Sequence, residues 1–140
     1  LYWPAVSQIC SLTFLLLALS VSTTAYAEDT AAPATQTAYV SLAPALVGNY
    51  GAGTKLKYYK ADIALRVQAE NVATVEYHEP LIRDQLIQLF AQQTDEDMQE
   101  SAGKEGVRQA ALKQVQQVLN QEEGQPLVED LLFNNLVVQP

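Results

Sequence analysis

Residues 55–68, KLKYYKADIALRVQ, alternate between apolar and polar side chains over most of their length. In an extended chain one face would carry Tyr59, Ala61, Ile63, Leu65 and Val67, and the other would carry Lys60, Asp62 and Arg66. Because successive side chains of a β-strand point to opposite faces, this period of two predicts a long strand with one buried face. Such a strand is typical of an antiparallel sheet with one solvated side.

The residues before this strand predict a second strand and a turn. Residues 39–47 are rich in β-formers, and Pro44, which lacks an amide donor, indicates an edge strand or a bulge. Residues 48–53, GNYGAG, predict the connecting turn. A phosphate-binding loop would need a helix directly after its glycines, and here a strand follows. We therefore expect a hairpin.

The residues after the strand change to the spacing of three and four that amphipathic helices show. Asn71 is a predicted helix cap, and Pro80 divides the apolar pattern that follows into two helices or one kinked helix. Thr94 is predicted to be the N-cap of a helix. The acidic residues 95–97 would then form its first turn, where their negative charge interacts favourably with the helix dipole. This short helix is expected to run through Glu100 and to end at Gly103.

A longer helix is predicted over residues 105–121, with a stop signal in Gly124-Gln-Pro126. Its inward face would hold Val107, Ala111, Leu112, Val115, Val118 and Leu119. Residues 127–138 predict a closing strand with a bulge or break at Asn134-Asn135. Two strands, two or three helices and a closing strand predict an α+β fold, in which the helices pack on a mainly antiparallel sheet.

The first 27 residues carry no charged side chain and contain an apolar run too short for an ordinary membrane span. The run is followed by Ala25-Tyr26-Ala27, whose small residues predict signal-peptide cleavage before Glu28. An uncleaved signal anchor over residues 5–27 is the alternative. We expect a signal segment over 1–27, a flexible tether over 28–38 and one exported domain over 39–140.

Catalytic and metal-binding patterns are weak in this sequence. The net charge of −8 disfavours nucleic acid, and the one cysteine, Cys10, lies in the signal segment. His78 is the only histidine and is expected to be exposed or to cap a helix, while Asp95-Glu96-Asp97 lacks the spacing of a calcium loop. The paired carboxylates at 122–123 and 129–130 are expected to be solvated. We therefore expect no enzyme, catalytic residue, cofactor or metal.

Two surfaces remain as candidates for binding other proteins. The outward face of the long helix is rich in glutamine, including Gln109, Gln116 and Gln117, although a solvated polar face explains this composition more simply. The closing strand, if it lies at an edge of the sheet, invites pairing with a neighbouring chain. A ring or fibre of like subunits is one outcome of such pairing.

Four segments together resemble the FliL family, the flagellar basal body-associated proteins. They are LKYYKADIAL at 56–65, EPLIRD at 79–84, QTDEDM at 93–98 and VEDLLFNNLVVQ at 128–139. The resemblance covers residues 39–139. It implies a periplasmic α+β domain similar to the stomatin-type (SPFH-like) fold, able to form rings.

The resemblance also implies a role in flagellar motility. Members of this family associate with the basal body and surround the stator units, and they support rotation in swimming, swarming and chemotaxis. Arg83 and Asp84 match the family's helix motif and become candidate interface residues, with a surface ion pair as the alternative. Phe133 matches an aromatic of the closing strand, and we expect a core role for it.

The signal-like N-terminus differs from the basic tail and full membrane anchor of typical members. Membrane association would then require an uncleaved N-terminus or a partner. We expect a periplasmic protein at the outer face of the inner membrane, near the flagellar basal body. The alternative is a soluble periplasmic adaptor, of binding or chaperone-like function, for envelope proteins.

Overall fold

The computed structural model describes residues 36–139, so the expected signal segment with Ala25 and Ala27, and most of the expected tether, lie outside the described residues. The described chain forms three strands, one 3₁₀ turn and four α-helices. In chain order these are β1 (Thr37–Tyr50), β2 (Lys57–Gln68), η1 (Ala69–Asn71), α1 (Val72–Tyr77), α2 (Glu79–Ala91), α3 (Asp95–Gln99), α4 (Ser101–Glu123) and β3 (Val128–Gln139).

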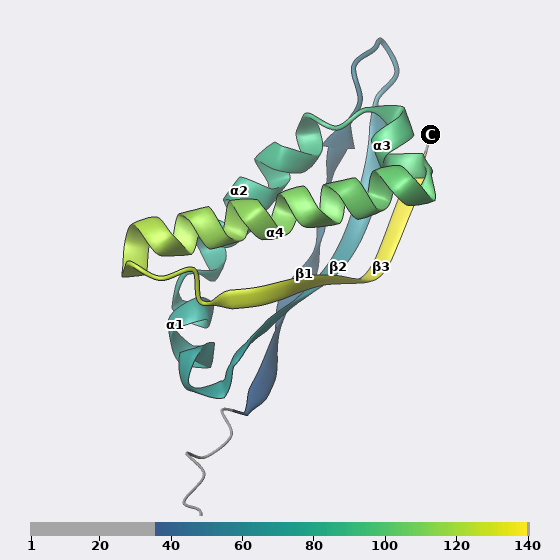
Figure 1. The fold of residues 1–140 in the computed structure, drawn as a ribbon. Coiled ribbons are helices and arrows are strands. Elements are labelled where there is room, and N and C mark those ends of the chain that lie inside the picture. Colours follow the sequence, from purple (N-terminus) through teal and green to yellow (C-terminus); the bar gives the residue numbers. More distant parts are fainter. Residues whose placement is uncertain (1–35, 140) are drawn as a thin grey trace, which may run out of the picture. The chain divides into compact units, whose positions relative to one another are not determined.

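The strands form one antiparallel sheet in the order β1-β2-β3, so the alternating strand of the sequence is the central one (Figure 1). Pro44 lies on an edge strand and in a register shift between Leu42 and Leu46. Both structures that the proline indicated, an edge strand and a bulge, are therefore present. β1 begins at Thr37, so the last two residues of the expected tether, 37 and 38, belong to the strand. The α+β fold class is confirmed, and the likeness to the stomatin-type fold stays a prediction.

The closing strand contains the expected bulge. Asp62 pairs with Asn135, and the next residue of β2, Ile63, pairs with Phe133. Asn134 is therefore the extra residue that bends β3. Gly124 ends α4 in the left-handed conformation, with φ of 76°, as the stop signal predicted.

Helices α1 and α2 are separate, because Pro80 lies in the first turn of α2, where its missing amide donor costs nothing. Asn71 occupies the N-cap of α1 but makes no side-chain capping bond. Thr94 caps α3 as expected: its hydroxyl accepts from the amide of Asp97 at 3.2 Å, and the Asp97 carboxylate accepts from the amide of Thr94 at 3.1 Å. The bonds from Thr94 lower the pKa of Asp97.

The prediction that Gly103 ends the short helix is wrong. Helix α3 ends at Gln99, Glu100 is extended, and α4 already begins at Ser101, so Gly103 lies in the first turn of the long helix. A Cβ atom at Gly103 would lie 2.5 Å from the carbonyl oxygen of Glu96 and 2.6 Å from Cα of Asp97. This glycine is therefore a point of close approach between α3 and α4, not a helix terminator.

The core lies between the sheet and the two long helices, α2 and α4, which also contact each other. All five predicted inward residues of β2 are buried, as are five of the six predicted for the long helix, and the sixth, Leu112, is partly buried. Phe90 packs against Tyr59 and against Phe133, with ring centroids 4.9 and 6.0 Å apart, which confirms the core role of Phe133. Burial raises the pKa of Tyr59 to about 12.

Candidate protein interface

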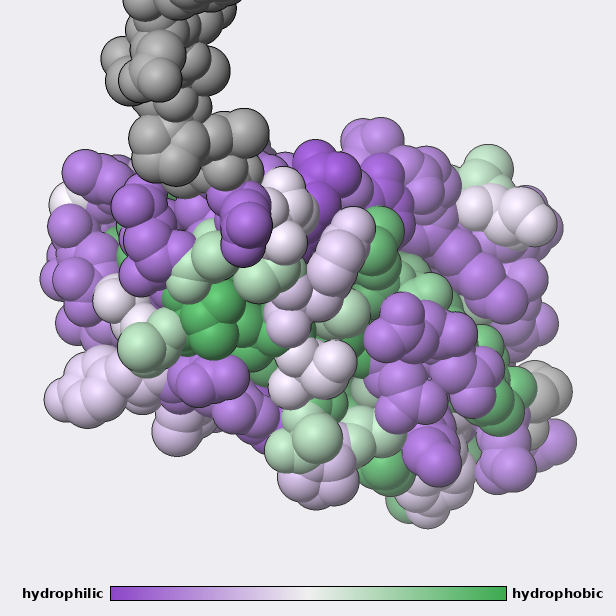
Figure 2. Space-filling model, turned by 90° about the horizontal axis from the view of Figure 1, so that it is seen from below, coloured by the Kyte–Doolittle hydropathy of each residue, from purple (hydrophilic) through white to green (hydrophobic). Residues whose placement is uncertain are grey.

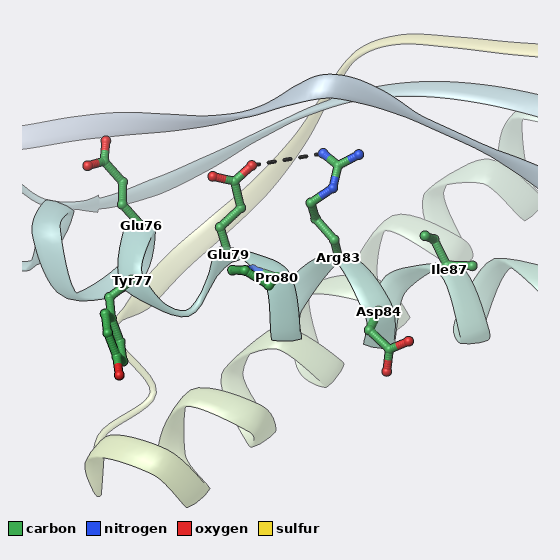
Figure 3. Close-up of a pocket in the computed structure, with 7 residues that line it drawn as sticks. All are labelled: Glu76, Tyr77, Glu79, Pro80, Arg83, Asp84 and Ile87. Carbon is green, nitrogen blue, oxygen red and sulfur yellow. Dashed lines mark ion pairs between the residues drawn. The ribbon is translucent and has the colours of Figure 1, made fainter.

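Helices α1 and α2 form an open groove on the surface, with a volume of about 550 Å³ (Figure 3). We call it the α1–α2 groove; its lining residues are Glu76, Tyr77, Glu79, Pro80, Arg83, Asp84 and Ile87. Pro80, Asp84 and Ile87 follow one another at helical spacings of four and three, so they lie on one stripe of α2. The buried residues of α2 (Ile82, Leu86 and Phe90) lie on a different stripe. The groove stripe is therefore left to solvent.

Arg83 is turned toward the sheet and does not pair with Asp84. Its Nη1 donates to the carbonyl oxygen of Pro44 at 2.6 Å and lies 3.9 Å from a carboxylate oxygen of Glu79 (Figure 3). Asp84 points the other way and accepts from Gln88 Nε2 at 3.0 Å. The alternative of an ion pair between the two motif residues is therefore wrong, and Arg83 helps to hold α2 against the bulge of β1.

The groove combines exposed apolar side chains with an excess of negative charge. Tyr77 is 79% exposed and Ile87 is 40% exposed. The lining contains three carboxylates (Glu76, Glu79 and Asp84) against one guanidinium, a formal charge of −2. Apolar groups rimmed by charge are typical of surfaces that bind other proteins. The sequence indicated Arg83 and Asp84 but not Tyr77 and Ile87. These two apolar residues lie outside the apolar stripe that packs against the core, and that position could have identified them as exposed.

The glutamines of α4 do not act as one surface. Gln109 and Gln117 are exposed, and Gln109 donates to Glu105 at 3.3 Å. Gln116 is partly buried and donates its Nε2 to the carbonyl oxygen of Val128 at 2.9 Å, which ties α4 to the start of β3. Only the first two therefore remain available to a partner.

Arg108 joins α4 to β3, a role that no sequence pattern indicated. Its guanidinium donates to both carboxylate oxygens of Glu105, at 2.5 and 2.8 Å, to Asp130 at 2.7 Å and to the carbonyl of Leu131 at 3.1 Å. The hydrogen bonds from Arg108 lower the pKa of Glu105 to about 2. Asp130 is thus partnered and partly buried, so the expectation of solvation is wrong for Asp130, whereas Glu129 is exposed as expected.

This arrangement predicts an acid sensitivity that depends on Glu105. A carboxylate whose pKa is lower in the folded state stabilises the fold above its ordinary pKa of 4.5, and this contribution disappears as the pH falls toward about 2. Glu105→Gln should therefore be less stable than the parent at pH 6, and the difference should shrink at pH 3, as measured by urea unfolding. Glu122→Gln, an exposed position on the same helix, is the control. An unchanged difference at both pH values would contradict the assignment.

His78 is largely shielded from solvent and is both the C-cap of α1 and the N-cap of α2. Its side chain is 10% exposed, and Nε2 lies 2.5 Å from Oε1 of Glu123, the last residue of α4. The residue occupies the junction of α1 and α2 without bonding to the helix backbone through its ring. The expectation that His78 caps a helix is confirmed by its backbone position, and Glu123 is exposed as expected. The pair connects the α1–α2 junction to the end of α4.

A second apolar area lies on the solvent side of the sheet. Val47, Tyr58 and Val137 are 63%, 45% and 44% exposed and line a hollow of about 390 Å³ together with Lys60 and Asn135. Figure 2, which looks at the end of the domain that is lowermost in Figure 1, also shows apolar residues gathered across the middle of that face, between hydrophilic ones. The domain thus has more than one surface suited to protein contacts.

Within residues 36–139, no group of three or more His, Cys, Asp or Glu side chains is arranged to hold a metal ion. Nor is any helix in the same range long and apolar enough to span a bilayer.

Comparison with known families gives one match. A family model described as "Flagellar basal body-associated protein FliL" matches residues 39–139, from the third residue of β1 to the last residue of β3. A comparison with individually curated proteins gives no significant match.

Proposed function

The chain belongs to the FliL family of flagellar basal body-associated proteins, and from this we propose that it is an accessory protein of the flagellar motor that binds itself and the stator units. In that role it supports rotation in swimming, swarming and chemotaxis. We place it in the periplasm, at the outer face of the inner membrane. The observation that carries the proposal is the family match over the whole sheet-and-helix domain.

The surfaces of the domain support a function in binding, not catalysis. The α1–α2 groove and the hollow on the sheet expose apolar side chains, and both edges of the three-stranded sheet carry backbone groups that a neighbouring strand can pair with. An accessory protein of this kind works mechanically, by holding the periplasmic linker of a stator unit in its open, ion-conducting arrangement.

Deletion of the gene tests the proposal. We expect swimming speed to fall most in viscous medium, where each motor needs more stator torque, and the wild-type gene supplied in trans to restore it. A fluorescently tagged copy should form foci at flagellar bases. Normal motility at high viscosity, with the tagged copy spread evenly around the cell, would contradict the proposal. Co-purification of envelope proteins without motor proteins would favour the soluble adaptor instead.

A further inference from the structure

Strand β3 lies at an edge of the sheet, and its two halves differ in how well that edge is covered (Figure 1). In the first half, Gln116 and Arg108 of α4 donate to the carbonyl oxygens of Val128 and Leu131. In the second half, residues 135–139, no backbone group bonds to a side chain or loop within residues 36–139. Natural proteins often cover an edge strand to prevent unwanted pairing. Here the cover from α4 extends over the first half only.

The second half of β3 carries apolar side chains on both faces, and neither face is fully buried. Val128 and Leu131, which face the core in the first half, are 2% and 0% exposed. Leu136 and Val138 also pack against the core but are only partly buried. Val137 points to the other face and is 44% exposed. Consecutive apolar residues are typical of strands covered on both faces, so this half has the composition of an interior strand at an edge position.

The hollow on the solvent side of the sheet adjoins this half of β3. It is lined by Asn135, Val137 and Gln139 of β3 and by Val47, Tyr58 and Lys60 of the neighbouring strands. Lys60 lies opposite Val137 and is exposed. It makes no ion pair with any residue in 36–139. The hollow therefore offers apolar surface and one positive charge to a side chain that reaches it from beyond β3.

A strand added beside residues 135–139 would place alternate side chains on these two faces. On the core face, apolar side chains would complete the burial of Leu136 and Val138. On the hollow face, the added strand would lie two strand spacings from β2, roughly 10 Å. A glutamate there and Lys60 can meet across this distance, because both side chains are long and both would pass over Val137. The surface thus fits an extended segment that is apolar on one face and acidic on the other.

We propose that an extended segment of another protein pairs with residues 135–139 as a fourth strand and directs an acidic side chain toward Lys60. A second copy of this chain fits the edge less well, because each copy carries a net charge of −8. The opposite edge, β1, is also interrupted at Pro44, whose carbonyl oxygen already accepts from Arg83. The inference rests on the proposed function in one respect, that the domain binds other proteins, and it names the surface and the chemistry of the partner.

A synthetic peptide tests the pairing in the full chain. The probe is fluorescein-labelled TVTVEVTV, whose valines share one face of an extended chain and whose glutamate lies on the other. Fluorescence anisotropy should show saturable binding, which is expected to be weak because so short an interface is far below the roughly 1,200 Å² of a stable one. The same peptide methylated at all its backbone amides cannot donate to β3 and should bind about tenfold more weakly. Equal binding of both peptides, or no saturable binding of the first, would overturn the proposal.

Charge exchange tests the role of Lys60. Lys60→Glu should bind TVTVEVTV about three- to tenfold more weakly than the parent and should bind TVTVKVTV more tightly than the parent does. Lys55→Glu is the matched control, since Lys55 is also exposed but does not line the hollow, and it should leave both affinities unchanged. Circular dichroism should show an unchanged fold for both variants. An unaltered preference in Lys60→Glu, or the same loss in Lys55→Glu, would exclude this pairing.

Amide hydrogen exchange of the full chain locates the bound peptide. TVTVEVTV should slow the exchange of amides within residues 135–139 that face away from β2, and it should leave residues 46–50 of β1 unchanged. Protection of β1 or of the α1–α2 groove instead would contradict the assignment. So would protection of residues 135–139 that appears without peptide and increases with protein concentration, because a second copy would then occupy the edge.

The tests separate this inference from the proposed function. Binding of the peptide at residues 135–139, together with normal motility of the deletion strain, would support the site and contradict the motor role. Impaired motility of the deletion strain without specific peptide binding would support the motor role and reject this site.

Discussion

Gly103→Ala is expected to lower the free energy of unfolding by about 2 kcal/mol, despite the higher helix propensity of alanine. The added Cβ would lie 2.5 Å from the Glu96 carbonyl oxygen and 2.6 and 2.8 Å from backbone atoms of Asp97. These neighbours are backbone atoms of α3, so no side chain can rotate to make room. Helix α3 would have to move away from α4, which would disturb Met98, buried at 0% exposure between them.

Gly106→Ala is the matched control, because Gly106 lies three residues further along the same helix and a Cβ added there would have no atom within 4 Å. There the substitution should raise the free energy of unfolding by about 0.5–1 kcal/mol through helix propensity alone. Urea unfolding of the two variants should therefore shift the midpoint in opposite directions. A stabilising Gly103→Ala would show that α3 does not pack against α4 in this way.

Phe90→Ala is expected to have the largest effect, a loss of about 3–5 kcal/mol. Phe90 is 0% exposed, and its ring lies between Tyr59 of the central strand and Phe133 of the closing strand. Removing the ring leaves a cavity where helix α2 meets two strands. Since domains of this size are stable by only about 5–15 kcal/mol, the variant should unfold at markedly lower temperature.

Ile87→Ala provides the comparison on the same helix. Ile87 is 40% exposed and lines the α1–α2 groove, so its truncation should change stability by less than about 1 kcal/mol. Thermal unfolding followed by circular dichroism measures both variants. A loss below about 1 kcal/mol for Phe90→Ala would mean that the three rings do not form the centre of the core.

Much of the fold could be predicted from local pattern. The alternation in residues 55–68 identified the central strand and its buried face, and the spacing in residues 105–121 identified the face of α4 that packs inward. Pro44 and Asn134-Asn135 marked two of the three register shifts in the sheet, and the third, at Glu129, had no such signal. These predictions succeeded because hydrophobic periodicity and proline geometry act within a few residues of chain.

The candidate interface could be predicted only in part. Arg83 and Asp84 came from the family resemblance, and both line the α1–α2 groove. The apolar members Tyr77 and Ile87 were missed, since an amphipathic pattern does not distinguish an apolar side chain left in solvent from one that is buried. Gly103 was misread because a glycine signal near a helix end fits both a terminator and a close approach of two helices.

The sequence by itself determined which segments become strands and helices, which of their faces are buried, and the family to which the chain belongs. Only the tertiary structure decided which distant residues meet: Arg108 with Asp130, His78 with Glu123, and Gln116 with the backbone of Val128. The physical reason is the separation in sequence over which each feature acts. Periodicity reports whether a side chain turns toward the core, whereas the partner of a polar group depends on how separate elements pack, and no local pattern records that packing.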